Sequence, residues 1–188
     1  MKQVYTIDDL VDGCQRGERK AQESLYRAVA SKMFHICLRY AGSEAEAEDI
    51  LQNGFIKVFQ CIPGFRGEGS FEGWLRRIFV NTAIETVRKN KRLQQVISVD
   101  QIFEEEQQTF DMDALEVRDL LRLIQGLPDG YRMVFNMYAI EGYSHKEIAE
   151  ALNISEGASK SQLSRARAWL KSKLVMLERG GNYGSYAG

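Results

Sequence analysis

Basic and aromatic residues share one stretch of the chain at helical spacing. From Arg76 to Arg92, six basic side chains stand against Glu85, a local net charge of +5. Helical periodicity places the following side chains near one face: Trp74, Arg77, Asn81, Arg88 and Arg92. A tryptophan at the head of a basic stripe, beside a loop with Phe65 and Arg66, suits a groove that follows a nucleic-acid backbone and stacks unpaired bases. The alternative is that Trp74 is a core residue.

A second candidate site occupies residues 143–163. Ser144 and Glu147 form a capping box for a short helix, Asn153 begins a turn, and Ser155 caps the next helix, which is a helix-turn-helix pattern. From residue 156 to residue 179, six basic side chains stand against two acidic ones, a local net charge of +4. The apolar face of this second helix consists of Leu163, Ala166, Trp169 and Leu170. The coincidence of cap, turn and charge favours reading of DNA over a merely solvated helix face.

Helices must position both sites. An apolar stripe with steps of three and four residues predicts a helix from about Arg19 to Tyr40, ending at Gly42, with a short helix before it at about residues 6–14. Ser43 and Glu46 predict a capping box for the next helix, which Pro63 ends. Ser70 can cap the helix that carries the first basic stripe. We therefore expect a compact helical unit up to about residue 92.

An acidic segment separates this unit from the helix-turn-helix. Residues 99–119 contain eight acidic side chains against one basic side chain, a local net charge of −7. We expect a solvated linker over 96–112, because like charges repel and extend a chain. The second unit then begins near Asp113, a candidate N-cap with Glu116 three residues on, and includes a helix that ends at Gly126. The predicted domains are 1–95 and 113–179, followed by a disordered glycine-rich tail over 180–188.

Composition bounds the class of protein. The chain has 188 residues, a length that suits one medium domain or two small ones, and its 44% hydrophobic and 27% charged residues with a net charge of −1 are typical of a soluble globular protein. Two prolines and the helical periodicities predict an all-α chain. With the motifs above, we expect two small helical domains joined by the acidic linker, the second a helix-turn-helix, winged-helix-like module. Three widely spaced cysteines fit neither a disulfide framework nor a paired zinc motif, so a reducing cytoplasm is expected. We expect no signal peptide and no membrane-spanning segment. No metal, cofactor, small-molecule substrate or enzymatic activity is expected either, since no catalytic arrangement stands out.

Three blocks in this order resemble the extracytoplasmic-function (ECF) class of bacterial RNA polymerase sigma factors. The first block, residues 47–59, is Ala-Glu-Asp-Ile-Leu-Gln-Asn-Gly-Phe-Ile-Lys-Val-Phe. It is similar to the family helix that docks on the clamp coiled coil of the polymerase β′ subunit. The resemblance implies that its polar face, Asp49, Gln52 and Asn53, makes this contact.

The second block, residues 65–82, is Phe-Arg-Gly-Glu-Gly-Ser-Phe-Glu-Gly-Trp-Leu-Arg-Arg-Ile-Phe-Val-Asn-Thr. It resembles the family segment that recognises and melts the minus-ten promoter element and captures a flipped non-template base. The resemblance, together with the basic stripe, implies a DNA-binding set made of Lys57, Phe65, Arg66, Trp74, Arg77, Asn81 and Arg88.

The third block is the helix-turn-helix, which is similar to the family module that reads the minus-thirty-five element in the major groove. The positions implied for phosphate and base contacts are Lys160, Ser161, Ser164, Arg165 and Arg167. Family members often have Thr-Val-Lys-Ser-Arg where this chain has Ala-Ser-Lys-Ser-Gln at 158–162. The resemblance further implies three partners: core RNA polymerase, at its β′ clamp and β flap; promoter DNA; and an anti-sigma factor, which holds many members inactive, sometimes at the inner membrane.

Two other functions compete with this interpretation. A helix-turn-helix regulator would use its first unit as a sensor or dimerisation domain and would bind duplex DNA without polymerase. An enzyme is a more distant alternative. The chain has two histidines, and His145 stands at the start of a capped helix, where a surface role is expected rather than catalysis.

Overall fold

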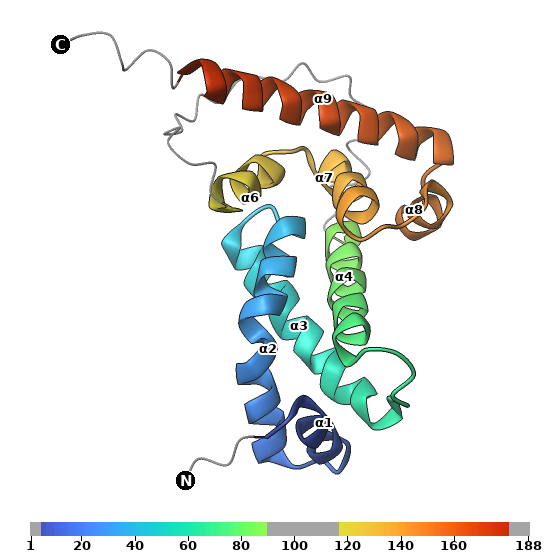
Figure 1. The fold of residues 1–188 in the computed structure, drawn as a ribbon. Helices are drawn as coiled ribbons and strands as arrows, with labels where there is room; N and C mark the ends of the chain where they lie inside the picture. Colours follow the sequence, from blue (N-terminus) through green and yellow to red (C-terminus); the bar gives the residue numbers. More distant parts are fainter. Residues whose placement is uncertain (1–4, 90–116, 181–188) are drawn as a thin grey trace, which may run out of the picture. The chain divides into compact units, whose positions relative to one another are not determined.

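The computed structural model describes residues 5–89 and 117–180, and these ranges contain helices joined by short turns (Figure 1). The chain divides into two compact units, Met1–Thr86 and Val87–Gly188. The all-α, two-unit architecture expected from the sequence is confirmed. The predicted acidic linker over 96–112, the Asp113 cap and the tail over 181–188 lie outside the described residues.

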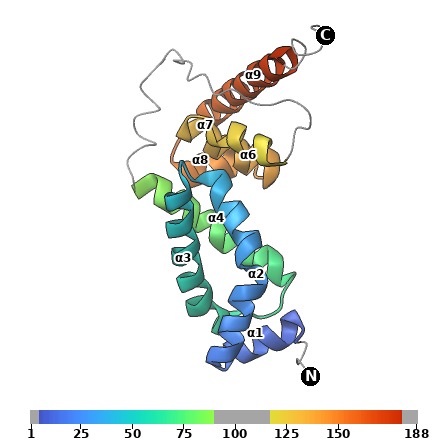
Figure 2. The ribbon, with the colours of Figure 1, turned by 90° about the vertical axis from the view of Figure 1, so that its left-hand side faces the viewer.

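The first unit is built from helices. These are α1 (Ile7–Gln15), α2 (Arg19–Tyr40), α3 (Glu44–Cys61), the short 3₁₀ helix η1 (Ile62–Gly64) and most of α4 (Phe71–Lys89), whose last residues lie beyond the boundary at Thr86. Helices α2 and α3 lie side by side, and α1 crosses the end of α2 (Figures 1 and 2). These bounds match the periodicities of the sequence closely, including the start of α2 at Arg19 and the end of α3 just before Pro63.

Caps define where these helices begin. Ser43 Oγ accepts a hydrogen bond from the Glu46 N–H at 3.2 Å, as the sequence predicted. The Glu46 carboxylate, however, accepts from the N–H of Gly42 at 2.7 Å, one residue earlier than in a standard capping box. Ser70 Oγ accepts from the Gly73 N–H at 3.0 Å and caps α4.

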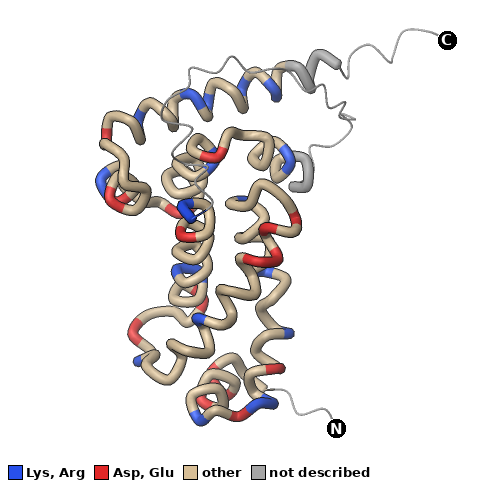
Figure 3. The backbone as a smooth tube through the Cα atoms, turned by 180° about the vertical axis from the view of Figure 1, so that it is seen from behind, with Lys and Arg blue, Asp and Glu red and all other residues tan. Residues whose placement is uncertain are grey.

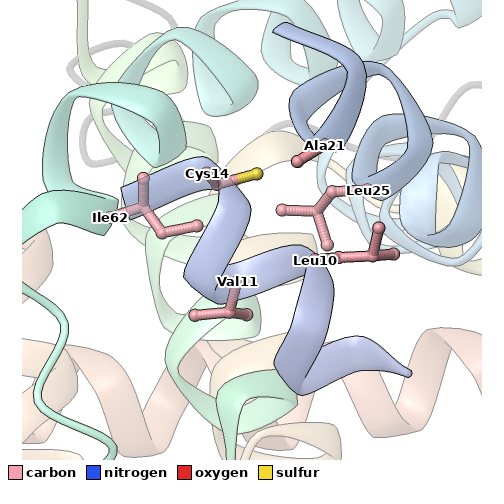
Figure 4. Close-up of a cluster of buried hydrophobic side chains, with 6 residues drawn as sticks. All are labelled: Leu10, Val11, Cys14, Ala21, Leu25 and Ile62. Atoms are coloured by element: carbon pink, nitrogen blue, oxygen red, sulfur yellow. The ribbon is translucent and has the colours of Figure 1, made fainter. Parts of the chain in front are cut away.

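The first unit encloses an apolar core between α1, α2 and η1. Figure 4 shows its central side chains, which are Leu10, Val11, Cys14, Ala21, Leu25 and Ile62. A second contact joins α3 to α4, where the rings of Phe55 and Phe79 meet edge to face at 5.2 Å between centroids. Gly54 allows this approach, because a Cβ at that position would lie 2.3 Å from Phe79 Cε1.

The second unit carries the helix-turn-helix. Its described elements are α6 (Val117–Gln125), α7 (Asp129–Phe135), the π-helix η2 (Asn136–Ile140), α8 (His145–Leu152) and α9 (Glu156–Gly180). Helix α9 packs against α6, α7 and α8. The apolar residues between α6, α7 and α9 are Leu123, Leu127, Tyr131, Ala166 and Leu170. Neither α7 nor the π-helix was expected from the sequence.

Candidate nucleic-acid interface

Three aromatic rings form one cluster where the loop after η1 meets the start of α4. Phe65 and Trp74 lie 5.0 Å apart between ring centroids, and Phe71 lies 5.5 Å from each of them. All three rings are half-buried and pack against the core that contains Ile62. Trp74 therefore packs at the edge of the core and is also partly open to solvent. We call Phe65, Phe71 and Trp74 the aromatic cluster.

The loop that carries Phe65 is tied to α1. Gln15 Nε2 donates to the carbonyl oxygens of Ile62, at 3.2 Å, and Phe65, at 2.8 Å. Gly67 and Gly69 then adopt φ angles of 72° and 89°, which glycine reaches without steric cost. Arg66 lies exposed on this loop. The role of Gln15 could not be read from the sequence, because it depends on a contact across almost fifty positions of the chain.

Helix α4 presents a polar face beside this loop. Arg77, Asn81 and Arg88 are exposed, while Leu75, Phe79 and Val80 on the other side of the helix are buried. Glu85 lies four residues after Asn81 on the same exposed stripe, and its carboxylate pairs with Lys57 of α3 at 2.7 Å. The structure thus brings Lys57 next to α4, and it places an acidic group inside the predicted basic stripe.

An exposed ion pair joins α2 to the first turn of α4. Lys32 Nζ lies 2.7 Å from Glu72 in the first turn of that helix. The hydrogen bond from Lys32 lowers the pKa of Glu72 below its ordinary value. A carboxylate in the first turn is also favoured by the positive end of the helix dipole.

The predicted polymerase contact lies on one face of α3. Asp49, Gln52 and Asn53 are all exposed, while Ile50, Phe55 and Val58 face the core. Ile56 continues this exposed face three residues after Asn53 and is 55% exposed. The exposed face of α3 thus carries one apolar side chain beside the three polar ones.

The helix-turn-helix begins with the capping box that the sequence predicted. Ser144 Oγ accepts from the Glu147 N–H, and the Glu147 carboxylate accepts from the Ser144 N–H at 2.8 Å. Asn153 then adopts a left-handed conformation with φ of 55°, which ends α8. Ser155 Oγ accepts from the Ala158 N–H at 3.0 Å and caps α9.

Helix α9 separates a buried face from a polar one. Its buried side chains pack against its own unit. Lysine and arginine positions recur along the helix, blue in Figure 3. The residues predicted to contact DNA are all exposed, namely Lys160, Ser161, Ser164, Arg165 and Arg167. Two of them contact tyrosines. Arg165 donates to Tyr131 Oη at 3.3 Å, and the Arg167 guanidinium lies 5.8 Å from the centroid of the Tyr138 ring.

A buried arginine holds the turn between α6 and α7. The side chain of Arg132 is 3% exposed and pairs with Asp129. It also donates to the carbonyl oxygens of Gln125 and Leu127, each at 2.9 Å. These carbonyls lie at the end of α6, where backbone acceptors lack helical partners. Arg132 thereby positions α7, on which α9 rests.

Within 5–89 and 117–180, no three His, Cys, Asp or Glu side chains gather where they could hold a metal ion. None of the helices described here has the length and apolar character needed to cross a membrane. The three cysteines are free thiols, and burial raises the pKa of Cys37 to about 12.

Comparison with known proteins agrees with this geometry. The family models that match are "Sigma-70 region 2", over residues 25–93, and "Sigma-70, region 4", over residues 118–170. The chain is 30% identical to the ECF RNA polymerase sigma-E factor of Escherichia coli strain K12, over 95% of this chain and 100% of that protein. It is 31% identical to the RNA polymerase sigma-H factor of Pseudomonas aeruginosa, over 90% of this chain and 94% of that protein.

Two solved structures are also similar. One is CnrH in complex with the cytosolic domain of CnrY, with a TM-score of 0.47, 22% identity and coverage of 89% of this chain and 96% of that chain. The other is the sigma factor RpoE in complex with the anti-sigma factor NepR from Bartonella quintana, with a TM-score of 0.49, 21% identity and coverage of 81% and 95%.

The two helical units, one of them a helix-turn-helix with a basic exposed face, define a bacterial transcription factor of the sigma type. The chain belongs to the extracytoplasmic-function family of RNA polymerase sigma factors, as the three sequence blocks implied. Members of this family are transcription initiation factors and not, in general, catalytic enzymes.

Proposed function

We propose that this sigma factor divides its work between its two units. Residues 1–95 would dock on the β′ clamp of core RNA polymerase through Asp49, Gln52 and Asn53 and would recognise and open the minus-ten element. Residues 113–179 would read the minus-thirty-five element and lie near the β flap. The acidic segment between them would set how far apart the two promoter elements can be.

The observation that carries this proposal is the two-faced surface of α9. Its apolar side is buried in its own unit, so its exposed side, with Lys160, Ser164 and Arg167, is the side available to DNA. A helix inserted this way contacts phosphates with its basic side chains and base edges with its arginines and hydroxyls. The capped start of the helix supports its entry into the major groove.

The first unit would act on separated strands. The aromatic cluster offers half-buried rings beside a loop held by Gln15, and Arg77 and Asn81 continue from it along α4. Aromatic rings stack on unpaired bases, and basic side chains follow the phosphates. We propose that Phe65, Arg66 and Trp74 border the pocket for a flipped base, with Lys57, Arg77, Asn81 and Arg88 along the strand. Strand opening of this kind needs no covalent chemistry by the sigma factor.

We further propose a cytoplasmic location and control by an anti-sigma factor. Free thiols at Cys14, Cys37 and Cys61 suit a reducing compartment. A partner that covers the exposed face of α3, including Ile56, would block polymerase docking. Binding to an anti-sigma factor anchored in the inner membrane would hold the protein at that membrane without a membrane helix of its own.

Run-off transcription tests the proposal. Core polymerase from the source bacterium is incubated with a pool of genomic promoter fragments, with and without this protein. We expect new discrete transcripts that disappear in a Trp74→Ala, Asn81→Ala variant. If no transcript appears and the protein alone shifts duplex DNA, the chain acts as a helix-turn-helix regulator and the proposed mechanism of promoter opening is wrong.

A further inference from the structure

A buried serine joins the two helices of the helix-turn-helix. Ser159, in the first turns of α9, is 0% exposed. Its hydroxyl lies 2.9 Å from Nδ1 of His145, the first residue of α8. A buried hydroxyl without a partner costs free energy, so this bond favours one arrangement of α8 and α9. His145 itself is half-buried, so it contributes a hydrogen bond between the two helices while part of its ring remains open to solvent.

The His145 ring also stacks on Tyr138. The ring centroids are 4.5 Å apart, and the planes differ by 22°. Tyr138 in turn lies under the guanidinium of Arg167 at 5.8 Å. The contacts thus run from Ser159 through His145 and Tyr138 to Arg167, which lies eight residues after Ser159 on the same helix. We call these four residues the His145 cluster.

The backbone at Tyr138 is unusual. Residues Asn136–Ile140 form a π-helix, whose wider turn changes the direction in which side chains leave the helix. The Tyr143 N–H donates to the Met137 carbonyl at 2.9 Å and closes the following turn. Short π-helical segments occur frequently at functional sites, and this one carries the ring that contacts both His145 and Arg167.

We propose that Tyr138 and His145 are positioning residues that hold Arg167 in the orientation in which it contacts promoter DNA. A guanidinium over an aromatic face keeps its in-plane N–H groups available for a phosphate or a base edge. The ring limits the rotamers of Arg167, so less conformational entropy is lost on binding. This inference rests on the proposed function of α9, and it adds two residues, outside α9, to the determinants of promoter affinity.

The test uses the full-length protein bound to core polymerase. The affinity for a promoter with an intact minus-thirty-five element is measured by fluorescence anisotropy for the wild type, Tyr138→Leu and Tyr138→Phe. We expect Tyr138→Leu to weaken binding about 3- to 10-fold, within the range of an aromatic contact to a cation, and Tyr138→Phe to bind like the wild type. A loss caused by misfolding would instead appear as a lower unfolding midpoint in the fluorescence of Trp169.

A double-mutant cycle identifies Arg167 as the residue through which Tyr138 acts. In an Arg167→Ala background, Tyr138→Leu should change affinity less than 2-fold, because the group it positions is gone. An equal loss in both backgrounds would overturn the proposal. Ser172→Ala, on the same helix and exposed, is the control for the serine variants below and should have no effect.

The contribution of the His145 ring stacked on Tyr138 is measured in variants that also lack the Ser159 hydroxyl, so that no buried hydroxyl is left without a partner. The double variants His145→Phe/Ser159→Ala and His145→Ala/Ser159→Ala both remove the hydrogen bond, and the first one keeps an aromatic ring on Tyr138. We expect the first to bind near the wild-type affinity and the second to weaken binding about as much as Tyr138→Leu. Equal affinities would contradict the role of His145.

Variants of α9 distinguish a wrong positioning role of Tyr138 from a wrong DNA-binding role of α9. If Lys160→Ala and Arg167→Ala weaken promoter binding while Tyr138→Leu does not, α9 binds DNA and the positioning role is wrong. If neither Lys160→Ala nor Arg167→Ala has an effect, α9 does not bind the promoter and both proposals are wrong.

Discussion

The two units of this sigma factor differ in what they bury. Among the described residues of the first unit, the ion pairs lie on the surface, and buried contacts are mostly apolar, including the ring contact of Phe55 with Phe79. The second unit buries polar side chains that bond between elements, above all Arg132 and Ser159. The hydrophobic effect has no preferred direction, whereas buried hydrogen bonds require a particular geometry.

This difference suits the two proposed tasks. Capture of a flipped base needs an aromatic ring with a face open for stacking. The rings of the aromatic cluster are half-buried, so part of each ring is exposed. Reading a duplex needs side chains held in register with base edges. In the second unit, the bond between Ser159 and His145 joins α9 to α8, and the bonds of Arg132 hold α7, against which α9 packs. We therefore expect the second unit to be the more sensitive of the two to loss of a polar side chain.

The largest effect is expected for Arg132→Met. The change leaves Asp129 without its arginine and removes the hydrogen bonds that Arg132 donates to the carbonyl oxygens of Gln125 and Leu127. Breaking a buried pair in this way lowers the free energy of unfolding by about 3–5 kcal/mol. Urea unfolding followed by tryptophan fluorescence checks this, because the chain has two tryptophans, one in each unit, and Trp74→Phe or Trp169→Phe leaves one probe.

Arg27→Met is the matched control in the first unit. Arg27 pairs with Glu23 one helical turn away, and both side chains are largely exposed. Loss of an exposed pair changes stability by about 0–1 kcal/mol. Equal destabilisation by Arg132→Met and Arg27→Met would remove the contrast between the two units.

A smaller effect is expected for Gly54→Ala in the first unit. The added methyl group would lie 2.3 Å from Phe79, whose ring is fully buried and has little room to move. Overpacking lowers the free energy of unfolding by about 1–3 kcal/mol. The higher helix propensity of alanine over glycine raises it by only about 1 kcal/mol. Gly64→Ala, which meets no atom within 4 Å, is the control. Stability unchanged in Gly54→Ala would show that α3 and α4 are not closely packed.

Polymerase docking should depend on the polar face of α3. We expect the triple variant Asp49→Ala/Gln52→Ala/Asn53→Ala to bind core polymerase about 10-fold more weakly, the loss typical of an interface that includes one strong contact. The fold should remain intact because all three side chains are exposed. Glu23→Ala, which removes one exposed carboxylate from α2, is the control for the negative charge lost at Asp49. Unchanged polymerase binding by the triple variant would contradict the docking assignment.

The smallest effect is expected for Glu85→Gln. Lys57 and Glu85 are partly exposed, so the pair itself contributes less than about 1 kcal/mol to stability. Without the charge of Glu85, however, Lys57 is free to pair with phosphate, and affinity for single-stranded minus-ten DNA should rise about 2- to 3-fold at low salt. Glu23→Gln should leave that affinity unchanged. A fall in affinity would mean that Glu85 orients Lys57 for DNA instead of competing with it.

Local sequence patterns predicted the elements that depend on local physics. Ser144 with Glu147, and the apolar steps of α9, specify a cap and a buried face within a few residues of each other. The contacts of Arg132 and Gln15 could not be predicted, because they end on carbonyl oxygens whose positions depend on a turn or on a distant helix. Tyr138 could not be predicted either, because its direction comes from a π-helical turn. Glu85 was visible in the sequence, but only the structure shows its partner.

The division of labour between the units is tested most directly by strand opening on two promoters. A 2-aminopurine base in the minus-ten element reports opening by the polymerase holoenzyme, on one promoter with an intact minus-thirty-five element and on one with that element scrambled. We predict that Trp74→Ala lowers opening on both promoters by the same factor, about 10-fold or more, as expected for the loss of one stacked base. Lys160→Ala should lower opening on the intact promoter only. Equal effects of Lys160→Ala on both promoters, or an effect of Trp74→Ala that depends on the minus-thirty-five element, would contradict the assignment of reading to one unit and opening to the other.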